Sequence, residues 1–559
     1  SMLHGLYMDL AMTAYLLVIP FLLFVFQKWI PLRKIMDRYH YAMIVIMALL
    51  FSGDAPLYRE WGFRLDKTAF NYITDFREAG SFISISNILY YLVFAIGHSV
   101  MGVYLYRKIV CPATSFSPAW LYVVHLLALP ALVIPMRGGF GIIPMNPGKV
   151  YFTNSPFPNH AALNAAWNLM YSLSKAKKKK SETRYMEEGE AARLVDSLYS
   201  GKNAGTEFVL RTSRPKILFL LMESFSAKLI NRSYRDSVIT PRLNEWIKTG
   251  LYWDSVYATG DRTEMGLAST LSAFPAQPQS SIVQFPAKTE KLPSLIRDLK
   301  KAGYQTAFYY GGDASFASMN SFLFNGGCDV IIDKSHFPSE SYNAKWGVHD
   351  HLVFERLYED IQADSTSFFK IGLSLSSHPP YEIPDLPLWS GPEEETLFLN
   401  AAHYTDHHLG VLLDKLSKLP VWNELLIVLV ADHGCRFPGN DPYHVPEKFR
   451  IPLWFGGGAV LRDSLIRKVG SQNDIPSTVL AQLKLPHSEF RFSQNLLSVN
   501  HSGTAYYAFN NGFGWVETNR SNVYSNDTKK IISSSGPAPQ DTRLGPAFLQ
   551  MVLDRFNAL

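Results

Sequence analysis

The sequence predicts a two-part chain, with several membrane-spanning helices at the N-terminus followed by a soluble α/β/α sandwich. Long apolar runs are confined to the first 140 of the 559 residues. After residue 214, short apolar runs alternate with helical patterns. A chain of this length is expected to contain at least two structural units. We place the membrane domain at 1–140, a juxtamembrane helix and linker at 141–213, and the soluble domain at 214–559.

The composition agrees with this division and excludes some functions. Hydrophobic residues make up 47% of the chain and aromatic residues 14%, which fits a protein partly embedded in a membrane. The formal net charge of +5 is small for this length and does not indicate nucleic-acid binding. The three cysteines, Cys111, Cys328 and Cys435, are widely separated, so they predict neither a disulfide framework nor a zinc knuckle.

Four segments are candidate membrane spans, since a bilayer core of about 30 Å needs roughly 20 apolar residues in a helix. They are 6–26, 41–52, 85–106 and 120–135. The second is short, and a run of that length is also typical of a buried or re-entrant helix. Extension to 39–58 would make it a span.

Basic residues predict the orientation, because lysine and arginine are enriched in cytoplasmic loops. They lie between the first two spans and after the third: Lys28, Arg33, Lys34, Arg38, Arg107 and Lys108. The soluble domain then lies outside the cytoplasmic membrane of a bacterium, in the periplasm or at the cell surface. The first visible residue also lies outside, so we expect one further helix upstream in the native chain.

Two features of the predicted linker each allow two interpretations. The segment 159–174 has apolar residues at helical spacing, which fits a helix lying in the membrane interface or one packed on a domain. The lysine-rich run 175–180 is typical of a solvated linker, although contact with anionic lipid would also suit it.

The soluble part has the pattern of a parallel sheet covered by helices. Short continuous apolar runs, which are typical of strands buried on both faces, occur at 216–222, 305–310, 368–374 and 425–430. Helical patterns lie between them at 240–249, 292–302 and 396–416. Ligands of such sheets bind beyond the carboxyl ends of the strands, so polar residues at those ends are the candidates for function.

A set of metal-ligand side chains lies at these strand ends. Glu223 follows the first strand, Asp432 and His433 follow the last, and Thr263 begins a predicted helix after a glycine-containing loop. Buried carboxylates are costly unless they are paired or bind a metal. Two carboxylates, an imidazole and a hydroxyl suit Mn²⁺ or Zn²⁺, with Mg²⁺ as an alternative.

Thr263 is a candidate nucleophile because metal coordination can activate a hydroxyl. At a helix N-terminus, free backbone N–H groups can also hold phosphate oxygens. Each motif alone has a simpler explanation. A threonine before a helix is commonly an N-cap, and an Asp-His pair after a strand is commonly a surface turn. The order and context of the motifs together favour a catalytic site.

These motifs resemble those of a known family. Met222-Glu223-Ser224-Phe225-Ser226, Thr240-Pro241-Arg242-Leu243, Thr263 and Ala431-Asp432-His433-Gly434 are similar to the lipoteichoic acid synthase and phosphoglycerol transferase branch of the sulfatase-like (alkaline phosphatase) superfamily. The resemblance covers nearly the whole chain, because several spans before an extracytoplasmic domain are that branch's architecture. It implies one catalytic metal, typically Mn²⁺, bound by Glu223, Thr263, Asp432 and His433, with Thr263 as nucleophile. It also implies five spans.

Two substrate residues follow from the resemblance. The segment 374–381 is similar to the family's serine-histidine-proline loop, which makes His378 the candidate for contacting the substrate phosphate or protonating the leaving alcohol. The segment 309–319 corresponds to the family's substrate loop and makes Asp313 a second candidate. Lipoteichoic acid synthases carry histidine, tryptophan and arginine there, whereas this chain has Tyr310, Phe316 and Ser318 and is closer to a glycine-glycine form of Gram-negative relatives.

The predicted activity is transfer of a lipid head group through a covalent threonine intermediate. The resemblance favours phosphoglycerol from phosphatidylglycerol, with an envelope glycan or lipid as acceptor. A phosphoethanolamine transferase is the alternative, although that class usually has several disulfides. A sulfatase is disfavoured because Thr263-Glu264-Met265-Gly266-Leu267 lacks the Cys/Ser-x-Pro-x-Arg context. A two-metal phosphatase and a non-catalytic lipid-binding homologue are the remaining alternatives.

Other polar residues have less definite roles. The segment 346–350 and His444 could line the pocket or hold a second metal ion. His403, His407 and His408 lie on a predicted helix, where surface or packing roles are more typical. Arg262, beside the nucleophile, could steady a phosphate or form a solvent-exposed salt bridge.

Overall fold

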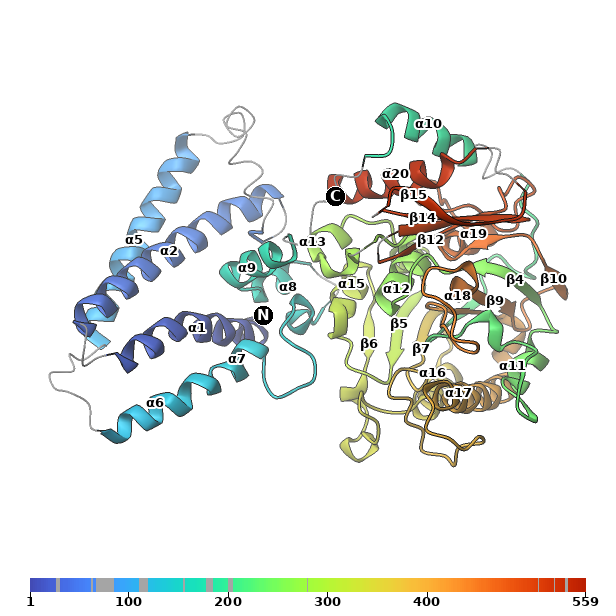
Figure 1. Cartoon of the computed structure of the whole chain (residues 1–559), viewed down its shortest axis with the longest axis horizontal. Coiled ribbons are helices and arrows are strands. Elements are labelled where there is room, and N and C mark those ends of the chain that lie inside the picture. Colours follow the sequence, from blue (N-terminus) through green and yellow to red (C-terminus); the bar gives the residue numbers. More distant parts are fainter. Residues whose placement is uncertain are drawn as a thin grey trace. The chain divides into compact units, whose positions relative to one another are not determined.

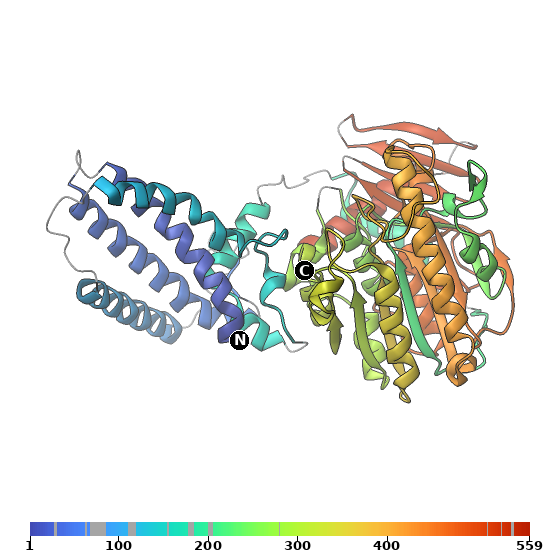
Figure 2. The ribbon, with the colours of Figure 1, turned by 90° about the horizontal axis from the view of Figure 1, so that it is seen from below.

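The computed structural model of the chain is shown in Figure 1 and, after a quarter turn, in Figure 2. It describes residues 1–26, 31–61, 64–66, 85–109, 119–153, 156–176, 184–199, 205–278, 280–510, 512–526, 528–537 and 541–559. Most of the lysine-rich run predicted at 175–180 lies outside the described residues, as does most of the loop between the third and fourth predicted spans.

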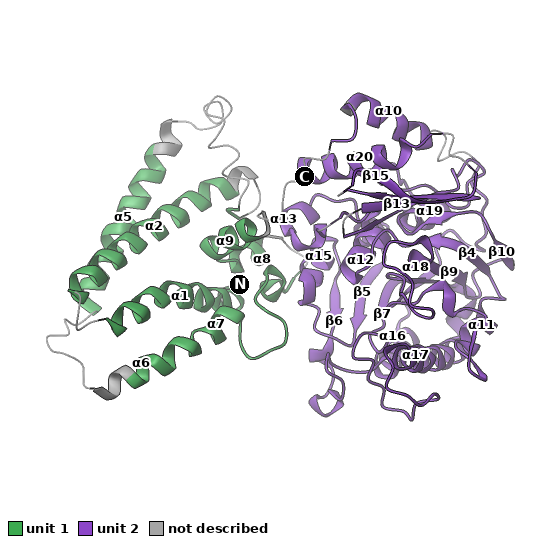
Figure 3. Cartoon of the chain, in the orientation of Figure 1, with its two compact units in different colours: residues 1–181 green, residues 182–559 purple. Residues whose placement is uncertain are grey.

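The chain forms two compact units, Ser1–Ser181 and Glu182–Leu559, which Figure 3 colours separately. The predicted domain boundaries at 140 and 214 therefore fall inside unit 1 and unit 2, and the predicted linker is divided between them. Its C-terminal part includes helix α10 (Glu188–Tyr199), which packs against α20 (Leu544–Ala558) in unit 2.

Among the residues of unit 1 that the structure describes, three helices are long and apolar enough to cross a membrane: Met2–Val25, Leu32–Tyr58 and Leu89–Ile109. They belong to α1 (Met2–Val25), α2 (Leu32–Trp61) and α5 (Ile85–Ile109). The second predicted span, which looked short in sequence, lies in the longest of these helices, with 30 residues. The three helices make unit 1 a multi-pass membrane domain.

Within the described residues, which resume at 119, the fourth predicted span is not one continuous full-length helix, and the number of spans stays a prediction. The chain there forms α6 (Ala119–Ala131) and α7 (Val133–Arg137), which are separate helices. The apolar helical stretch Val123–Arg137 falls short of the length that a span needs. Helix α7 ends at Gly138, whose φ of 82° is a left-handed conformation that favours glycine.

The amphipathic segment predicted at 159–174 packs on its neighbours within unit 1. It forms α8 (Pro156–Ala162) and α9 (Ala165–Ala176), which contact α1 and α2. Ala165 and Trp167 are buried, and Asn164 between the two helices donates a hydrogen bond to Asp9 at 2.8 Å. These contacts are with the apolar helices of unit 1, so both interpretations of this segment stay predictions.

The core of unit 2 is a mixed sheet with the strand order β10-β4-β9-β8-β1-β7-β5-β6, in which β11 also pairs with β4. Strands β8, β1, β7, β5 and β6 are parallel, as predicted, but β9 is antiparallel to both of its neighbours. The expected parallel sheet is therefore corrected to a mixed one. The strands are β1 (Lys216–Met222), β4 (Leu251–Tyr257), β5 (Gln305–Tyr310), β6 (Val330–Ile332), β7 (Phe368–Leu373), β8 (Leu425–Ala431), β9 (Arg450–Gly456), β10 (Ser464–Ile466) and β11 (Gly470–Ser471).

The four predicted strands are confirmed as β1, β5, β7 and β8, which are almost entirely buried. Their continuous apolar runs follow from burial on both faces. The predicted helices are also present, as α11 (Pro241–Trp246), α14 (Leu295–Lys301) and α17 (Glu394–Leu416).

Helices cover both faces of this sheet, which confirms the predicted α/β/α sandwich. Helices α16 (Asp350–Ala363) and α17 lie side by side on one face, with α11 against α17 (Figure 2). On the other face α12 (Thr263–Ser272) contacts α14 and α19 (Ile475–Gln482). The shorter helices of unit 2 are α13 (Pro286–Thr289), α15 (Met319–Asn325) and α18 (Pro446–Phe449).

A second, antiparallel sheet follows near the C-terminus and was not predicted from the sequence. It is a meander of β12 (Thr504–Phe509), β13 (Gly512–Glu517), β14 (Arg520–Ser525) and β15 (Lys530–Ser535). Helix α20 packs on β13 and carries α10 on its other side. A separate two-stranded hairpin joins β2 (Ser233–Tyr234) to β3 (Ser237–Val238).

Candidate metal centre

The predicted metal ligands meet because β1 and β8 are neighbours in the sheet. Their parallel register pairs Met222 with Ala431, the last residue of each strand. Glu223 and Asp432 are the next residues, so both carboxylates emerge at the same edge. Glu223 is 3% exposed and Asp432 is fully buried. The continuous apolar strands therefore deliver two carboxylates into a site from which water is largely excluded.

The side chains of Glu223, Asp432 and His433 each have a ligand atom within 4.8 Å of the others. His433 Nε2 lies 3.6 Å from Glu223 Oε1 and 3.7 Å from Asp432 Oδ2, which is too long for hydrogen bonds. Asp432 Oδ1 accepts hydrogen bonds from the backbone N–H groups of Ser224 (2.9 Å) and His433 (2.6 Å), whereas Asp432 Oδ2 is buried without a hydrogen-bond partner. These residues fit a divalent cation, which would satisfy the second oxygen.

The charges of the three groups are strongly coupled. Burial raises the pKa of Asp432, and the nearby carboxylate of Glu223 raises it further. Burial opposes ionisation of Glu223 too, but the positive charges of His433 and His378 keep its pKa below the ordinary value. Burial alone would lower the pKa of His433. The negative charges of Asp432 and Glu223 outweigh this effect, so the pKa of His433 is raised. Oxygen and nitrogen donors in such a set suit Mn²⁺ or Zn²⁺.

Thr263 lies at this centre, as the first residue of α12. Its Oγ1 donates a hydrogen bond to Glu223 Oε2 at 3.0 Å, and its side chain is buried. Gly266, one turn further on, allows the helix to lie directly on the backbone of Asp432. A Cβ atom at Gly266 would come within 2.1 Å of Asp432 O. The glycine is therefore a condition for bringing Thr263 to the two carboxylates.

Substitution of Gly266 by alanine tests that contact. The new methyl group cannot be accommodated without moving α12 away from Asp432, because its nearest neighbours are backbone atoms. We expect destabilisation of about 1–3 kcal/mol and weaker binding of Mn²⁺, measured by thermal unfolding with and without the metal. Ala268→Gly on the same helix is the control for changed helix propensity. Unaltered metal binding in Gly266→Ala would contradict the proposed contact.

His378 follows β7, the neighbour of β1 on the side away from β8. The loop 374–378 is bonded to Glu223 at both backbone groups: Ser374 Oγ accepts from Glu223 N at 2.8 Å, and Ser377 Oγ donates to Glu223 O at 2.6 Å. His378 is half-buried, and its Nδ1 lies 2.9 Å from Pro379 O. The loop that carries His378 is therefore anchored to the backbone of Glu223, and the charge of His378 acts to lower the pKa of Glu223.

Asp313 follows β5, and its carboxylate forms hydrogen bonds within its own turn. Its Oδ1 accepts hydrogen bonds from the backbone N–H (2.9 Å) and the hydroxyl (2.6 Å) of Ser315, and Oδ2 lies 3.7 Å from Lys334 Nζ. The structure does not group Asp313 with the metal ligands, and its substrate role stays a prediction. Tyr310, at the end of β5, is buried, and burial together with the charges of Glu223 and Asp432 raises the pKa of its hydroxyl.

The remaining histidines form no second metal site among the residues that the structure describes. His403 Nδ1 contacts Ile239 O at 2.9 Å, and the ring of His408 packs against Tyr404 with centroids 4.6 Å apart, so both have packing roles. The ring of His444 lies 5.6 Å from that of Tyr443. Arg262 is exposed next to Thr263. One residue of the predicted segment 346–350, Asp350, bonds the His378 loop, a contact that sequence reasoning missed.

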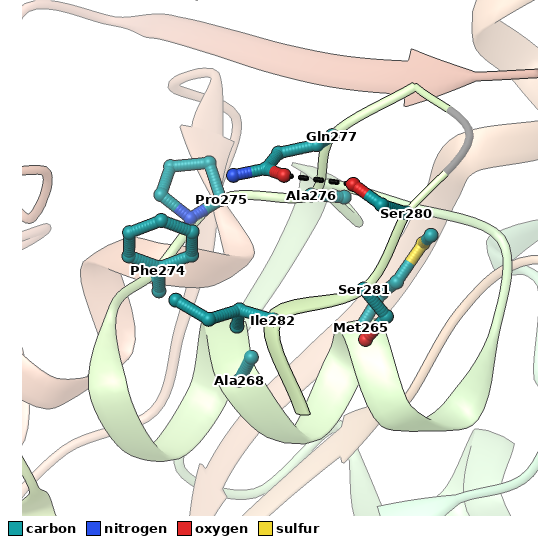
Figure 4. Close-up of a pocket in the computed structure, with 9 residues that line it drawn as sticks. All are labelled: Met265, Ala268, Phe274, Pro275, Ala276, Gln277, Ser280, Ser281 and Ile282. Carbon is teal, nitrogen blue, oxygen red and sulfur yellow. Dashed lines mark hydrogen bonds between the residues drawn. The ribbon is translucent and has the colours of Figure 1, made fainter. Parts of the chain in front are cut away.

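A separate small pocket lies beside α12 (Figure 4). Met265 and Ala268 line it, as expected for a helix with about 3.6 residues per turn. The hollow is small and partly open to solvent. Gln277 Oε1 accepts a hydrogen bond from Ser280 Oγ at 2.9 Å at its rim. None of the metal-centre residues lines this pocket, so it is not the place where the chemistry would occur.

The mixed sheet, with acidic and histidine side chains at the ends of β1 and β8, forms an α/β/α domain with a candidate metal centre. The Sulfatase family profile matches residues 215–485, just under half of the chain. That region is a sulfatase-like enzyme domain related to lipoteichoic acid synthases and phosphoglycerol transferases.

Two relatives and one solved structure give the extent of the similarity. Phosphoglycerol transferase I of Xanthomonas campestris pv. campestris is 27% identical over 213 residues, which are 36% of this chain and 30% of that protein. A lipoteichoic acid synthase-like protein of Bacillus subtilis is 22% identical over 348 residues, 56% of this chain and 55% of that protein. A lipoteichoic acid synthase of Listeria monocytogenes shares the fold, with a TM-score of 0.53 and 20% identity over 65% of this chain and 98% of that one. The chain spans only about a third to about half of the two relatives it matches in sequence.

Proposed function

We propose that the chain transfers the phosphoglycerol head group of phosphatidylglycerol to an acceptor in the bacterial envelope, through a covalent intermediate on Thr263. The observation that carries the proposal is the Thr263 hydroxyl, 3.0 Å from Glu223 at the N-terminus of α12 and beside Asp432 and His433. The sequence similarity to phosphoglycerol transferases supports the choice of head group. The apolar helices of unit 1 suit a donor that is itself a membrane lipid.

Glu223, Thr263, Asp432 and His433 would hold one divalent cation, for which we propose Mn²⁺, with Zn²⁺ or Mg²⁺ as alternatives. When bound, such a cation lowers the pKa of the coordinated hydroxyl and offsets the charge of the phosphate. The unpartnered Oδ2 of Asp432 and the two carboxylates around Thr263 support this ligand set.

Each of these residues has a separate role in the proposed two-step transfer. Thr263, having released its hydroxyl proton to solvent, attacks the phosphorus through Oγ1; the bond between Oγ1 and phosphorus forms, and the bond from phosphorus to the diacylglycerol oxygen breaks. The N–H groups in the first turn of α12 orient the phosphate oxygens. His378 contacts the phosphate and gives a proton to the leaving diacylglycerol oxygen. In the second step an acceptor hydroxyl attacks the phosphorus and its proton passes to His378, which replaces the proton that went to diacylglycerol. The bond to Thr263 breaks and leaves Oγ1 deprotonated, as it was at the start.

We further propose that unit 2 lies on the outer side of the cytoplasmic membrane. The basic residues Arg107 and Lys108 at the end of α5 support this orientation. Donor lipids in the outer leaflet would then be presented to the catalytic unit. Phosphoethanolamine transfer is less well supported, because Cys328 and Cys435 are both free thiols in the described part of the chain.

The test is the intact mass of the protein after incubation with Mn²⁺ and a vesicle of phosphatidylglycerol and phosphatidylethanolamine, followed by an acid quench. We expect an adduct with the mass of phosphoglycerol and an equivalent release of diacylglycerol. An adduct with the mass of phosphoethanolamine would replace the proposed donor by the alternative one. Neither adduct nor diacylglycerol, from protein that binds Mn²⁺, would overturn the proposed transfer.

A further inference from the structure

We propose that Asp350 is a positioning residue for the transfer reaction, and that it acts by holding His378 at the metal centre. Asp350 is the first residue of α16 and is fully buried, and it lies outside the metal-ligand group. The inference rests on the proposed function, because it assigns Asp350 a role in placing one of the groups that carry the reaction.

The carboxylate of Asp350 fixes the backbone of the His378 loop. Its Oδ1 accepts a hydrogen bond from Leu375 N at 2.6 Å, and Ser376 N lies 3.3 Å from Oδ1 and 3.2 Å from Oδ2. The backbone N–H of Asp350 in turn donates to Ser376 Oγ at 3.1 Å. His378 N donates to Leu375 O at 2.9 Å, so the residue bonded to Asp350 also bonds His378. The loop is thereby clamped two and three residues before the histidine.

Asp350 itself is held by a second helix. Thr405 Oγ1, on α17, donates to Asp350 Oδ2 at 2.7 Å, and Thr405 is fully buried. Helices α16 and α17 pack against each other along one face of the sheet. The carboxylate is therefore fixed between the body of the fold and the loop.

The same loop is bonded to the metal ligand on its other side. Ser374 and Ser377 bond the backbone N–H and C=O of Glu223, at 2.8 and 2.6 Å. The loop is therefore bonded to Glu223 through Ser374 and Ser377, and to Asp350 through the two residues between them. Loss of the Asp350 anchor leaves Leu375 N and Ser376 N without an acceptor in a buried place, so the loop must shift to find one. Because the Glu223 anchor remains, the shift is expected to displace His378 while the metal ligands stay in place.

The test is a double-mutant cycle between Asp350→Ala and His378→Ala in the full-length protein. Head-group transfer from phosphatidylglycerol vesicles is measured together with the affinity for Mn²⁺. We expect Asp350→Ala to lower kcat about 10- to 100-fold and to leave the Mn²⁺ affinity within about threefold. In the His378→Ala background the same change should cost less than about threefold, because residues that act as a unit are not additive. Asp350→Asn keeps one acceptor oxygen for the loop and should restore most of the rate.

Asp406 provides a matched control. It is also fully buried on the same face of the sheet, and it accepts hydrogen bonds from the backbone N–H groups of Arg242 (2.9 Å) and Leu243 (2.7 Å), away from the His378 loop. Asp406→Ala should lower the thermal stability as Asp350→Ala does, but leave kcat unchanged. The proposal would be overturned if Asp350→Ala lowered kcat equally in the wild-type and His378→Ala backgrounds. It would also be overturned if Asp406→Ala showed the same loss of kcat, because Asp350 would then have only a structural role.

The proposed function can fail separately from this inference. If the wild type transfers no head group, the same cycle is measured as the affinity for glycerol 3-phosphate in the presence of Mn²⁺. Weaker binding by Asp350→Ala that disappears in the His378→Ala background supports the positioning role. Equal weakening in both backgrounds overturns it.

Discussion

Thr263→Ala should lose the covalent adduct completely and lower head-group transfer by at least about 10³-fold, as expected when the nucleophile of a two-step mechanism is removed. The substitution removes the hydroxyl that donates to Glu223 Oε2 at 3.0 Å and the γ-methyl group of a buried side chain. The cost in unfolding free energy should be about 1 kcal/mol for the hydrogen bond and about 1 kcal/mol for the methyl group. The measurements are the intact mass after an acid quench and the initial rate of diacylglycerol release.

Two variants make this result specific. Thr263→Ser keeps a hydroxyl at the same place and should retain adduct formation. Thr270→Ala removes a buried hydroxyl on the same helix, where Thr270 Oγ1 donates to Gly266 O at 2.8 Å, and should leave transfer intact. Substantial transfer by Thr263→Ala would show that the phosphoryl group never resides on Thr263, and the mechanism would then be direct transfer to the acceptor.

The sequence predicted the strands and ligands that depend on local pattern. Buried parallel strands are continuous apolar runs, so β1 and β8 were recognisable along their whole length, and Glu223 and Asp432 stood out as carboxylates at their ends. The adjacency of β1 and β8 is a long-range property of the sheet, yet the ligand types alone were enough to suggest it. The antiparallel direction of β9 could not be predicted, because its sequence is as apolar as that of a parallel strand.

Features that depend on tertiary contacts were missed. The carboxylate of Asp350 appeared in sequence only as part of a loop near a tryptophan, and its bonds to Leu375 and Ser376 cross 25 and 26 residues of chain. Gly266 likewise gave no sign of its contact with Asp432 O, since a glycine near a helix start is usually a turn or cap signal.

Asp432→Asn is expected to remove metal binding while leaving the fold in place. Its Oδ1 accepts from Ser224 N and His433 N, and an asparagine oxygen can keep both of these hydrogen bonds. The change acts on Oδ2, the buried oxygen that has no protein partner, and replaces it by an NH₂ group that cannot bind a cation. We expect the Mn²⁺ affinity to fall by about 100-fold or more. Substitution of residues that only hydrogen-bond to metal ligands already lowers metal affinity by about 10- to 100-fold, and Asp432 is proposed as a ligand itself.

The readout is the thermal stability of the protein as Mn²⁺ is added. A ligand that binds only the folded state at 100 times its Kd stabilises that state by about 2.7 kcal/mol, so the wild type should gain several degrees and Asp432→Asn almost none. Asp313→Asn is the matched control, because Asp313 bonds Ser315 and lies outside the metal-ligand group. A full Mn²⁺ response in Asp432→Asn would mean that the cation binds elsewhere, and a lost response in Asp313→Asn would place Asp313 among its ligands.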